Sequence, residues 1–262
     1  MPLADRYDGF LIDLDGVVWI GREPVPGAPE ALQTLLEAGK RLVFVTNNPG
    51  RPPAAYAERL RGLGVGIDAG QIVTAGVVVA RLAGEAAGAG GSAFVIGAEA
   101  LKEMVAATGA TLLAGEEARD AEVVVVSGHR DFDYGELTSA KFALDRGAAL
   151  FATSHDPTMP YPGGELPGTG AVLAAVEVAS GRQAVIAGKP ERHLFEIAIE
   201  ALGQPAGRVA MIGDRLSSDI EGGRRAGLET ILVLSGTTSR EQAEAADQAP
   251  DHVLADLAAL VR

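Results

Sequence analysis

The chain has 262 residues, of which 47% are hydrophobic, and a formal net charge of −13, which allows one large domain or two small ones. The acidic balance argues against a nucleic-acid partner, because phosphate backbones are bound by clustered Lys and Arg. Without cysteine there is no disulfide framework, thiol nucleophile or zinc–thiolate site. No targeting segment and no apolar run of about 18 residues occurs, so we expect a cytoplasmic protein without a membrane partner.

Near the start of the chain, the apolar run Phe10-Leu11-Ile12 leads directly into two carboxylates, Asp13 and Asp15, and Gly16 follows. Such a run is typical of a strand buried on both faces of a parallel sheet. Ligands of these sheets bind beyond the carboxyl ends of the strands, so we expect the carboxylates at a site. Carboxylates this close repel each other, and a hard cation such as Mg²⁺ would relieve that repulsion.

A strand that ends in an ordinary turn is the simpler interpretation of this stretch, because Asp and Gly are common turn residues. A calcium loop of the EF-hand type also contains Asp-x-Asp. It is excluded because Val17 occupies the third ligand position and no glutamate closes the loop. The choice between a turn and a metal site therefore depends on the rest of the chain.

The next segments predict a strand, a helix and a parallel strand. Apolar residues recur at helical spacing from Ala28 to Ala38, and Leu42-Val43-Phe44-Val45 is a second buried run. This run leads into Thr46-Asn47-Asn48. A right-handed crossover brings the ends of both strands to one edge of the sheet, so we expect Thr46 to face Asp13.

The rest of the chain predicts further alternation of strands and helices, and hence an α/β fold with a parallel sheet. Residues 84–92 are mostly Gly and Ala, and we expect them to bend and to lead into a second domain. Residues 157–168 form a Pro/Gly-rich loop. Strands are expected at 72–74, 94–96, 123–126, 150–152, 185–187, 209–212 and 231–234, and helices at 53–63, 98–108, 134–146, 171–179, 193–202 and 254–261.

Polar residues follow the apolar runs at three strand ends, and a loop lysine joins them: Asp13 with Asp15, Thr46 with Asn47, Asp214 with Arg215, and Lys189. Each position has an ordinary interpretation as a helix cap, a turn or a strand exit. Phosphoryl transfer is the chemistry that needs all of them together. A charged phosphate monoester resists nucleophiles unless the protein supplies positioning and positive charge.

The first motif supplies the reacting groups in this hypothesis. Asp13 would attack phosphorus and form an aspartyl-phosphate, which splits one difficult displacement into two. Asp15 would protonate the leaving alkoxide as a general acid and then activate water for the second step.

The other motifs would hold the phosphate and the metal. Thr46 and Asn47 would bind the phosphate oxygens, and Lys189, one of four lysines in the chain, would neutralise developing charge. Asp214 would complete the Mg²⁺ site. Asp219 would ligate through water or orient a ligand.

Four segments carry these residues: Asp13-Leu14-Asp15-Gly16-Val17-Val18-Trp19, Val45-Thr46-Asn47-Asn48, Gly188-Lys189-Pro190 and Gly213-Asp214-Arg215-Leu216-Ser217-Ser218-Asp219-Ile220. Together they resemble the haloacid dehalogenase superfamily, and within it the NagD-like phosphatases. The resemblance covers nearly the whole chain and implies a Rossmann-like core. It also implies that the side chains of Asp13 and Asp214 and the backbone carbonyl of Asp15 bind Mg²⁺.

The resemblance further implies an α/β cap domain inserted at residues 79–184 into a catalytic core of residues 1–78 and 185–262. Such caps close over the site and contact the leaving group, so the loop at 154–164 is the candidate specificity element. Its candidate contacts are His155, Asp156 and Tyr161. Ser154 and Pro49-Gly50 depart from the family pattern. Relatives often dimerise through the cap, and a homodimer of this kind is left open.

The sequence thus predicts a Mg²⁺-dependent phosphatase that acts on a small phosphorylated metabolite. The first alternative is a phospho-accepting, receiver-like signalling domain, which also uses clustered acids, a threonine and a lysine. Such a receiver needs neither Asp15 nor a cap. The second alternative is a non-catalytic sugar-phosphate binding protein, which would not need a competent residue at every catalytic position.

Overall fold

The computed structural model describes residues 1–161, 164–203 and 208–262. They gather into two compact units, which we call the core unit and the inserted unit. The core unit comprises Met1–Thr46, Pro53–Val73 and Lys189–Arg262, and the inserted unit comprises Asn47–Pro52 and Thr74–Gly188. The division into domains at residues 79 and 184 stays a prediction. Within the described ranges, no helix has the length and apolar character that a membrane crossing requires.

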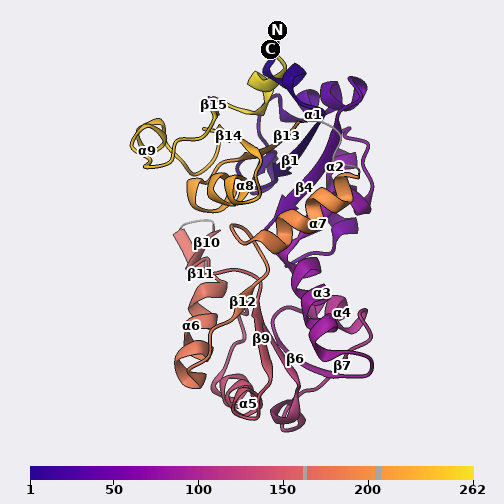
Figure 1. Ribbon diagram of the computed structural model, residues 1–262, viewed down its shortest axis with the longest axis vertical. Helices are drawn as coiled ribbons and strands as arrows, with labels where there is room; N and C mark the ends of the chain where they lie inside the picture. The colour runs from indigo at the N-terminus through magenta and orange to yellow at the C-terminus, as the bar shows by residue number, and fades with distance from the viewer. Residues whose placement is uncertain (162–163, 204–207) are drawn as a thin grey trace. The chain divides into compact units, whose positions relative to one another are not determined.

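The core unit is built on a six-stranded sheet in the order β15-β14-β13-β1-β4-β5. Figure 1 labels these strands except β5. β1 pairs in parallel with β4 and with β13, and β14 and β15 continue the parallel arrangement. Every residue of β1 is buried, as predicted for a strand covered on both faces. The bounds are β1 Gly9–Asp13, β4 Arg41–Thr46, β5 Ile72–Thr74, β13 Val209–Gly213, β14 Glu229–Val233 and β15 His252–Leu254.

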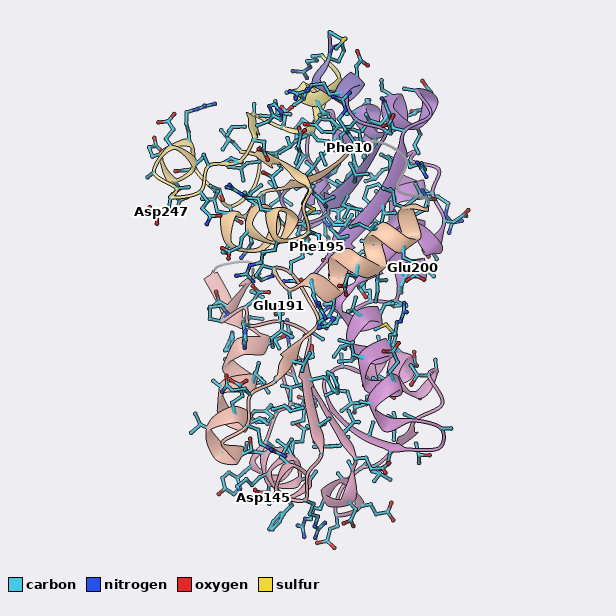
Figure 2. The ribbon with its side chains drawn as sticks, in the orientation of Figure 1. Phe10, Asp145, Glu191, Phe195, Glu200 and Asp247 are labelled. Atoms are coloured by element: carbon cyan, nitrogen blue, oxygen red, sulfur yellow. The ribbon has the colours of Figure 1, made fainter. Side chains whose placement is uncertain are left out.

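Helices cover both faces of this sheet. Phe10 and Ile12 point to a face that packs with residues of α1, α2 and η5 in one apolar cluster. A Cβ on Gly9, the neighbour of Phe10, would lie 3.1 Å from the Leu202 side chain, which places α7 on the opposite face. Figure 2 labels Phe10 and Phe195, which are both fully buried. The helices and helical turns are η1 Leu3–Arg6, α1 Ala28–Glu37, α2 Pro53–Gly62, η2 Ala69–Gln71, α7 Arg192–Leu202, η4 Leu216–Ile220, α8 Glu221–Arg225, α9 Arg240–Glu244 and η5 Leu257–Val261.

The inserted unit has a five-stranded sheet of its own in the order β12-β9-β8-β6-β7, with parallel pairs throughout. α5 and α6 share an apolar cluster with alternate residues of β6 and β8, while α3 contacts β8, β9 and α4. The fold is therefore α/β, as predicted. The bounds are α3 Ala75–Ala87, β6 Ser92–Ile96, α4 Glu99–Ala106, β7 Thr111–Leu112, η3 Glu117–Asp120, β8 Val123–Val126, α5 Tyr134–Asp145, β9 Ala149–Ala152, α6 Thr169–Ser180 and β12 Val185–Ile186.

The Gly/Ala segment at 84–92 differs from its prediction, because its first residues belong to α3. A Cβ on Gly84 would lie 2.6 Å from the Thr108 side chain beyond the end of α4. The small residue therefore permits close packing instead of bending the chain. The bend comes later, at Gly88 and Gly90, whose φ angles are +71° and +78°.

Two segments that contain proline and glycine form short hairpins, and one of them is the expected loop at 157–168. The segment at 157–168 holds β10 (Thr158–Tyr161) and β11 (Gly164–Pro167), paired antiparallel with Met159 level with Leu166. The turn near Gly21 holds β2 (Trp19–Ile20) and β3 (Glu23–Pro24). Their proline and glycine content hid the pairing, since both residues weaken a strand pattern. The weak helix expected at 254–261 is partly the strand β15 and partly the turn η5.

Candidate active site

The sheet register of the core unit brings three of the predicted residues to one edge. Asp13 ends β1 and Thr46 ends β4, while Asp214 directly follows β13. Asp13 lies level with Val45, and Ile12 lies level with Ile212. All three strands run in the same direction, so these side chains leave the sheet together at its carboxyl edge.

Lys189 joins two carboxylates of this edge. Its Nζ donates hydrogen bonds to Asp13 Oδ1 at 2.7 Å and to Asp219 Oδ1 at 2.6 Å. The side chains of Lys189, Asp13 and Asp219 are only 3%, 10% and 0% exposed. A buried ion pair is weak evidence for stability, because desolvation offsets its attraction. The arrangement is more readily explained by a charged site than by the needs of the fold.

Asp214 is held by backbone groups and by close glycine contacts. Its Oδ2 accepts a hydrogen bond from Thr237 N at 2.6 Å. A Cβ on Gly236 would lie 2.1 Å from that oxygen, and a Cβ on Gly16 would lie 2.5 Å from it. Only glycine leaves room here, and Gly16 also has φ +86°.

The acidic residues fit a hard cation. Asp13, Asp214 and Asp219 each offer a carboxylate oxygen within 4.8 Å of the others, and oxygen donors are what Mg²⁺ and Ca²⁺ prefer. Asp214 Oδ1 is buried and has no hydrogen-bond partner among the described residues. A buried carboxylate oxygen without a partner is costly unless something binds it. These residues therefore suit a divalent metal ion.

The electrostatics of the site depend on burial first. Burial raises the pKa of Asp13 well above its ordinary value, against the lowering effect of the Lys189 ammonium. Burial also raises the pKa of Asp214, and the neighbouring charge of Asp219 adds to that effect. Burial alone would lower the pKa of Lys189, but Asp13 and Asp219 hold it above its ordinary value. A bound dication would favour the ionised carboxylates.

Asp15 is unlike the other carboxylates of the site because its side chain is exposed to solvent. Its Oδ1 accepts a hydrogen bond of 3.0 Å from Trp19 Nε1. An exposed carboxyl group two residues beyond Asp13 is suited to exchanging protons with a leaving group or with water.

The remaining predicted residues lie on or next to the inserted unit. Thr46 is buried, and Asn47 after it donates a hydrogen bond from Nδ2 to Asp156 Oδ2 at 3.3 Å. His155 is exposed. The side chain of Tyr161 lies outside the described residues.

Two groups at the site were absent from the predicted set. One is the Thr237 backbone N–H that holds Asp214, and the other is the Trp19 indole that meets Asp15. A sequence signal existed for the first, because Ser235-Gly236 directly follows an apolar run that ends at the same edge of the sheet. Trp19 belongs to the first motif, but nothing in the sequence indicated that its indole N–H would donate to Asp15.

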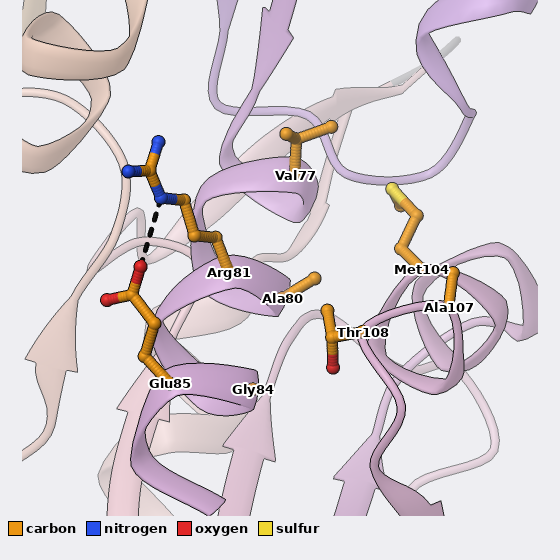
Figure 3. Close-up of a pocket in the computed structure, with 8 residues that line it drawn as sticks. All are labelled: Val77, Ala80, Arg81, Gly84, Glu85, Met104, Ala107 and Thr108. Atoms are coloured by element: carbon orange, nitrogen blue, oxygen red, sulfur yellow. Dashed lines mark hydrogen bonds and ion pairs between the residues drawn. The ribbon is translucent and has the colours of Figure 1, made fainter. Parts of the chain in front are cut away.

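A separate hollow of about 530 Å³ lies in the inserted unit between α3 and α4. Figure 3 shows Arg81 and Glu85 paired at its margin and Met104 at the opposite side. None of the predicted catalytic residues lines it, so we do not regard it as the active site. Its lining residues are Val77, Ala80, Arg81, Gly84, Glu85, Met104, Ala107 and Thr108.

Comparison with known proteins identifies the family of this chain. A family model described as haloacid dehalogenase-like hydrolase matches residues 10–111, and a second model of that type matches residues 186–260. Chronophin from Mus musculus is 41% identical over 249 residues, which cover 92% of this chain and 85% of that protein. The 5'-nucleotidase YutF of Bacillus subtilis is 34% identical over 252 residues, which cover 96% of each chain.

Comparison with solved structures leads to the same family. The glycerol phosphate phosphatase of Mycobacterium tuberculosis, solved in complex with magnesium, has a TM-score of 0.91 and 33% identity, and the match covers 100% of this chain and 78% of that one. The chain therefore belongs to the haloacid dehalogenase superfamily of hydrolases. Within that superfamily it is a phosphoric monoester hydrolase of the NagD-like type, which confirms the predicted family and enzyme class.

Proposed function

We propose that this phosphatase hydrolyses small organic phosphomonoesters through an aspartyl-phosphate on Asp13, with Mg²⁺ as its cofactor. The observation that carries the proposal is the buried network of Asp13, Lys189 and Asp219 beside the unpartnered oxygen of Asp214. In this proposal Asp13 is the nucleophile, Lys189 is the fixed positive charge beside it, and the cation site is formed by carboxylates whose oxygens lie within 4.8 Å of one another.

In the first step, a carboxylate oxygen of Asp13 attacks phosphorus as the bond to the leaving oxygen breaks. Asp15 gives its proton to that oxygen, so an alcohol leaves and Asp15 becomes a carboxylate. Lys189 offsets negative charge on the phosphoryl oxygens, while Thr46 and Asn47 position them.

In the second step, the Asp15 carboxylate takes a proton from water as the water oxygen attacks phosphorus. The bond between phosphorus and Asp13 breaks, inorganic phosphate is released, and both aspartates return to their starting states. Asp15 thus acts as acid and base in turn, and its exposed position suits this role.

Asp13 and Asp214 would hold the Mg²⁺ ion through their side chains, with the backbone carbonyl of Asp15. The ion supplies positive charge that offsets the crowded carboxylates and polarises a phosphoryl oxygen. Asp219, fixed by Lys189 and by the backbone N–H of Arg215 at 3.0 Å, would orient the ligands from outside.

The substrate is a small phosphorylated metabolite, and relatives named for glycerol phosphate and for nucleotides support this class. The loop with His155, Asp156 and Tyr161 would contact the leaving group. A cytoplasmic location and a homodimer formed through the inserted unit stay predictions from the sequence.

Trapping the intermediate tests the proposal. With p-nitrophenyl phosphate, whose leaving group needs little protonation, Asp15→Asn should form the aspartyl-phosphate and hydrolyse it slowly. Mass spectrometry of acid-quenched protein should then detect one added phosphoryl group in Asp15→Asn and none in the Asp13→Asn/Asp15→Asn double variant.

The same experiment separates the alternatives. A receiver-like domain would accumulate phosphoryl groups in the wild type without turnover, and a binding protein would accumulate none. Undiminished turnover in Asp13→Asn, which should lose at least about 10³-fold in kcat, would refute the nucleophile assignment.

A further inference from the structure

The structure carries an interaction of Asp15 for which the catalytic cycle gives no account. Trp19 Nε1 donates to Asp15 Oδ1 at 3.0 Å, although the Trp19 ring is buried and Asp15 is exposed. We propose that Trp19 is a positioning residue, whose indole N–H fixes the carboxyl group of Asp15 where it must exchange protons. The inference rests on the proposed general acid role of Asp15.

The backbone of the first motif folds so that Trp19 returns to Asp15. Leu14 O accepts hydrogen bonds from the N–H groups of Val18 at 2.9 Å and Trp19 at 3.2 Å, and Gly16 N donates to Trp19 O at 2.7 Å. Asp15 and Trp19 also form an isolated bridge. Main-chain hydrogen bonds therefore hold Trp19 beside Asp15, and they do not depend on either side chain.

The Trp19 ring packs against two side chains of α2. The Arg59 guanidinium lies 3.8 Å from the ring centroid, and Tyr56 stacks nearly parallel at 6.4 Å with an interplanar angle of 5°. Arg59 also donates to Gly21 O at 2.7 Å. A ring held by a cation, an aromatic neighbour and the apolar core presents its N–H in one direction.

A fixed donor matters for an exposed carboxyl group. Asp15 is otherwise free to change rotamer in solvent, whereas a general acid must lie within hydrogen-bond reach of the proton acceptor. The competing explanation is that Asp15 merely satisfies a buried N–H group. In that case the bond would contribute to stability and not to proton transfer.

Leaving-group dependence separates these explanations. The test compares kcat/KM for glycerol phosphate, whose alkoxide needs a proton, with kcat/KM for p-nitrophenyl phosphate, whose leaving group needs little. Trp19→Phe should lower the first value by about ten-fold, a part of the roughly 10²–10⁴-fold that general acid catalysis supplies, and leave the second almost unchanged. Equal losses for both substrates would overturn the proposal.

Two further variants guard against a folding effect. Benzothienylalanine at position 19 replaces the N–H by sulfur in a ring of similar shape, and it should reproduce the selective loss. Leu35→Ala opens a cavity in the same apolar cluster and should lower stability without changing the ratio of the two kcat/KM values. A changed ratio in Leu35→Ala, or a wild-type ratio with benzothienylalanine, would contradict the positioning role.

A double-variant cycle connects the effect to Asp15. If Trp19 acts through Asp15, then Trp19→Phe should cause no further loss for glycerol phosphate in an Asp15→Asn background. Full additivity would overturn the inference. If Asp15→Asn alone shows no leaving-group dependence, the general acid assignment fails and this proposal fails with it. Dependence in Asp15→Asn but none in Trp19→Phe defeats only the role of Trp19.

The protein offers an independent spectroscopic readout, because Trp19 is its single tryptophan. Its emission responds to the carboxylate charge beside the indole N–H, which Asp15→Asn removes, and this readout needs no turnover. Asp15→Asn should shift the emission, and Asp145→Asn, which removes an exposed carboxylate of α5, should not. Identical emission of wild type and Asp15→Asn would show that the indole does not sense Asp15.

Discussion

At the scale of single residues, Lys189 decides the electrostatics of the site. Its ammonium lies between Asp13 and Asp219, two buried carboxylates that would otherwise repel each other. Each of the three groups is desolvated, so the removal of one partner leaves an uncompensated charge. In the proposed mechanism the same ammonium is the positive charge that a phosphate would meet, so Lys189 would serve both the stability of the site and catalysis.

We expect Lys189→Met to lower the free energy of unfolding by about 3–5 kcal/mol, the usual cost of leaving a buried charge unpaired. Urea denaturation in the presence of a chelator measures this loss without a metal ion to compensate it. Lys189→Met/Asp219→Asn should recover part of the stability, because one of the unpaired carboxylates is then removed. If the double variant loses as much stability as Lys189→Met and Asp219→Asn lose together as single variants, the pairing inferred for this site is incorrect.

At the scale of elements, glycine sets how closely α3 and α4 approach. A Cβ on Gly84 would meet the Thr108 Cβ and Oγ1 at 2.6 Å, whereas a Cβ on Gly76 in the same helix would meet the end of the flexible Met104 side chain at 2.7 Å. The two positions differ in what must move, since methionine adapts readily and a β-carbon near the backbone does not.

Gly84→Ala should therefore destabilise the protein by about 1–2 kcal/mol, because overpacking outweighs the gain of roughly 1 kcal/mol in helix propensity. Gly76→Ala should cost less than Gly84→Ala, because the end of Met104 can move and the remaining close contact, with Pro49 Cβ, is 3.2 Å. Thermal unfolding of the two variants gives the comparison, and equal midpoints would count against the packing argument.

A second element-scale feature is the attachment of β15 to β14. Asp251 Oδ2 accepts hydrogen bonds of 2.8 Å from both Thr230 N and Thr230 Oγ1. Partial burial by itself would raise the pKa of Asp251, but these hydrogen bonds outweigh it and the pKa is lowered. Asp251, which directly precedes β15, is therefore bound to Thr230 of β14 in its ionised form.

The pH dependence follows from that direction. A carboxyl group with a lowered pKa in the folded state contributes stability above its unfolded pKa of about 3.9, and the contribution is lost as pH falls through the folded value. Asp251→Ala should therefore have a lower melting temperature than wild type at pH 7. The difference should shrink below about pH 4, as followed by circular dichroism. A difference that is constant with pH would show that the charge of Asp251 is unimportant.

At the scale of the whole molecule, the chain passes between its two units at residues of the site. Thr46 ends one segment of the core unit and Lys189 begins another, while Asn47 and Gly188 belong to the inserted unit. A Cβ on Gly188 would lie 2.5 Å from both Asn47 Oδ1 and Thr153 O. Position 188, directly before Lys189, therefore has room only for glycine.

Metal binding should stabilise the whole protein, because the carboxylates of the site come together only in the folded state. At Mg²⁺ concentrations about 100 times Kd, we expect a gain of about 2.7 kcal/mol, seen as a higher unfolding midpoint than with a chelator. Asp214→Asn should abolish the gain, and Asp145→Asn should keep it. A full Mg²⁺ effect in Asp214→Asn would place the ion elsewhere.

The sequence by itself determined the family, the enzyme class and most of the elements. Apolar runs such as Phe10-Leu11-Ile12 predicted the buried strands, because a strand covered on both faces leaves no polar position. The carboxyl edge of a parallel sheet then indicated where Asp13, Thr46 and Asp214 would meet. These inferences hold because local pattern and chain direction are sufficient for them.

Only the tertiary structure decided which groups touch. The sheet register and the loop after β14 aim the Thr237 N–H at Asp214, and the main-chain bonds of Leu14 turn the Trp19 indole back to Asp15. Residues 84–87 are helical because α3 packs closely against α4. No local pattern specifies the distance between these two helices. Contacts between distant segments are set by packing and by backbone geometry together, and neither is written in the spacing of residue types.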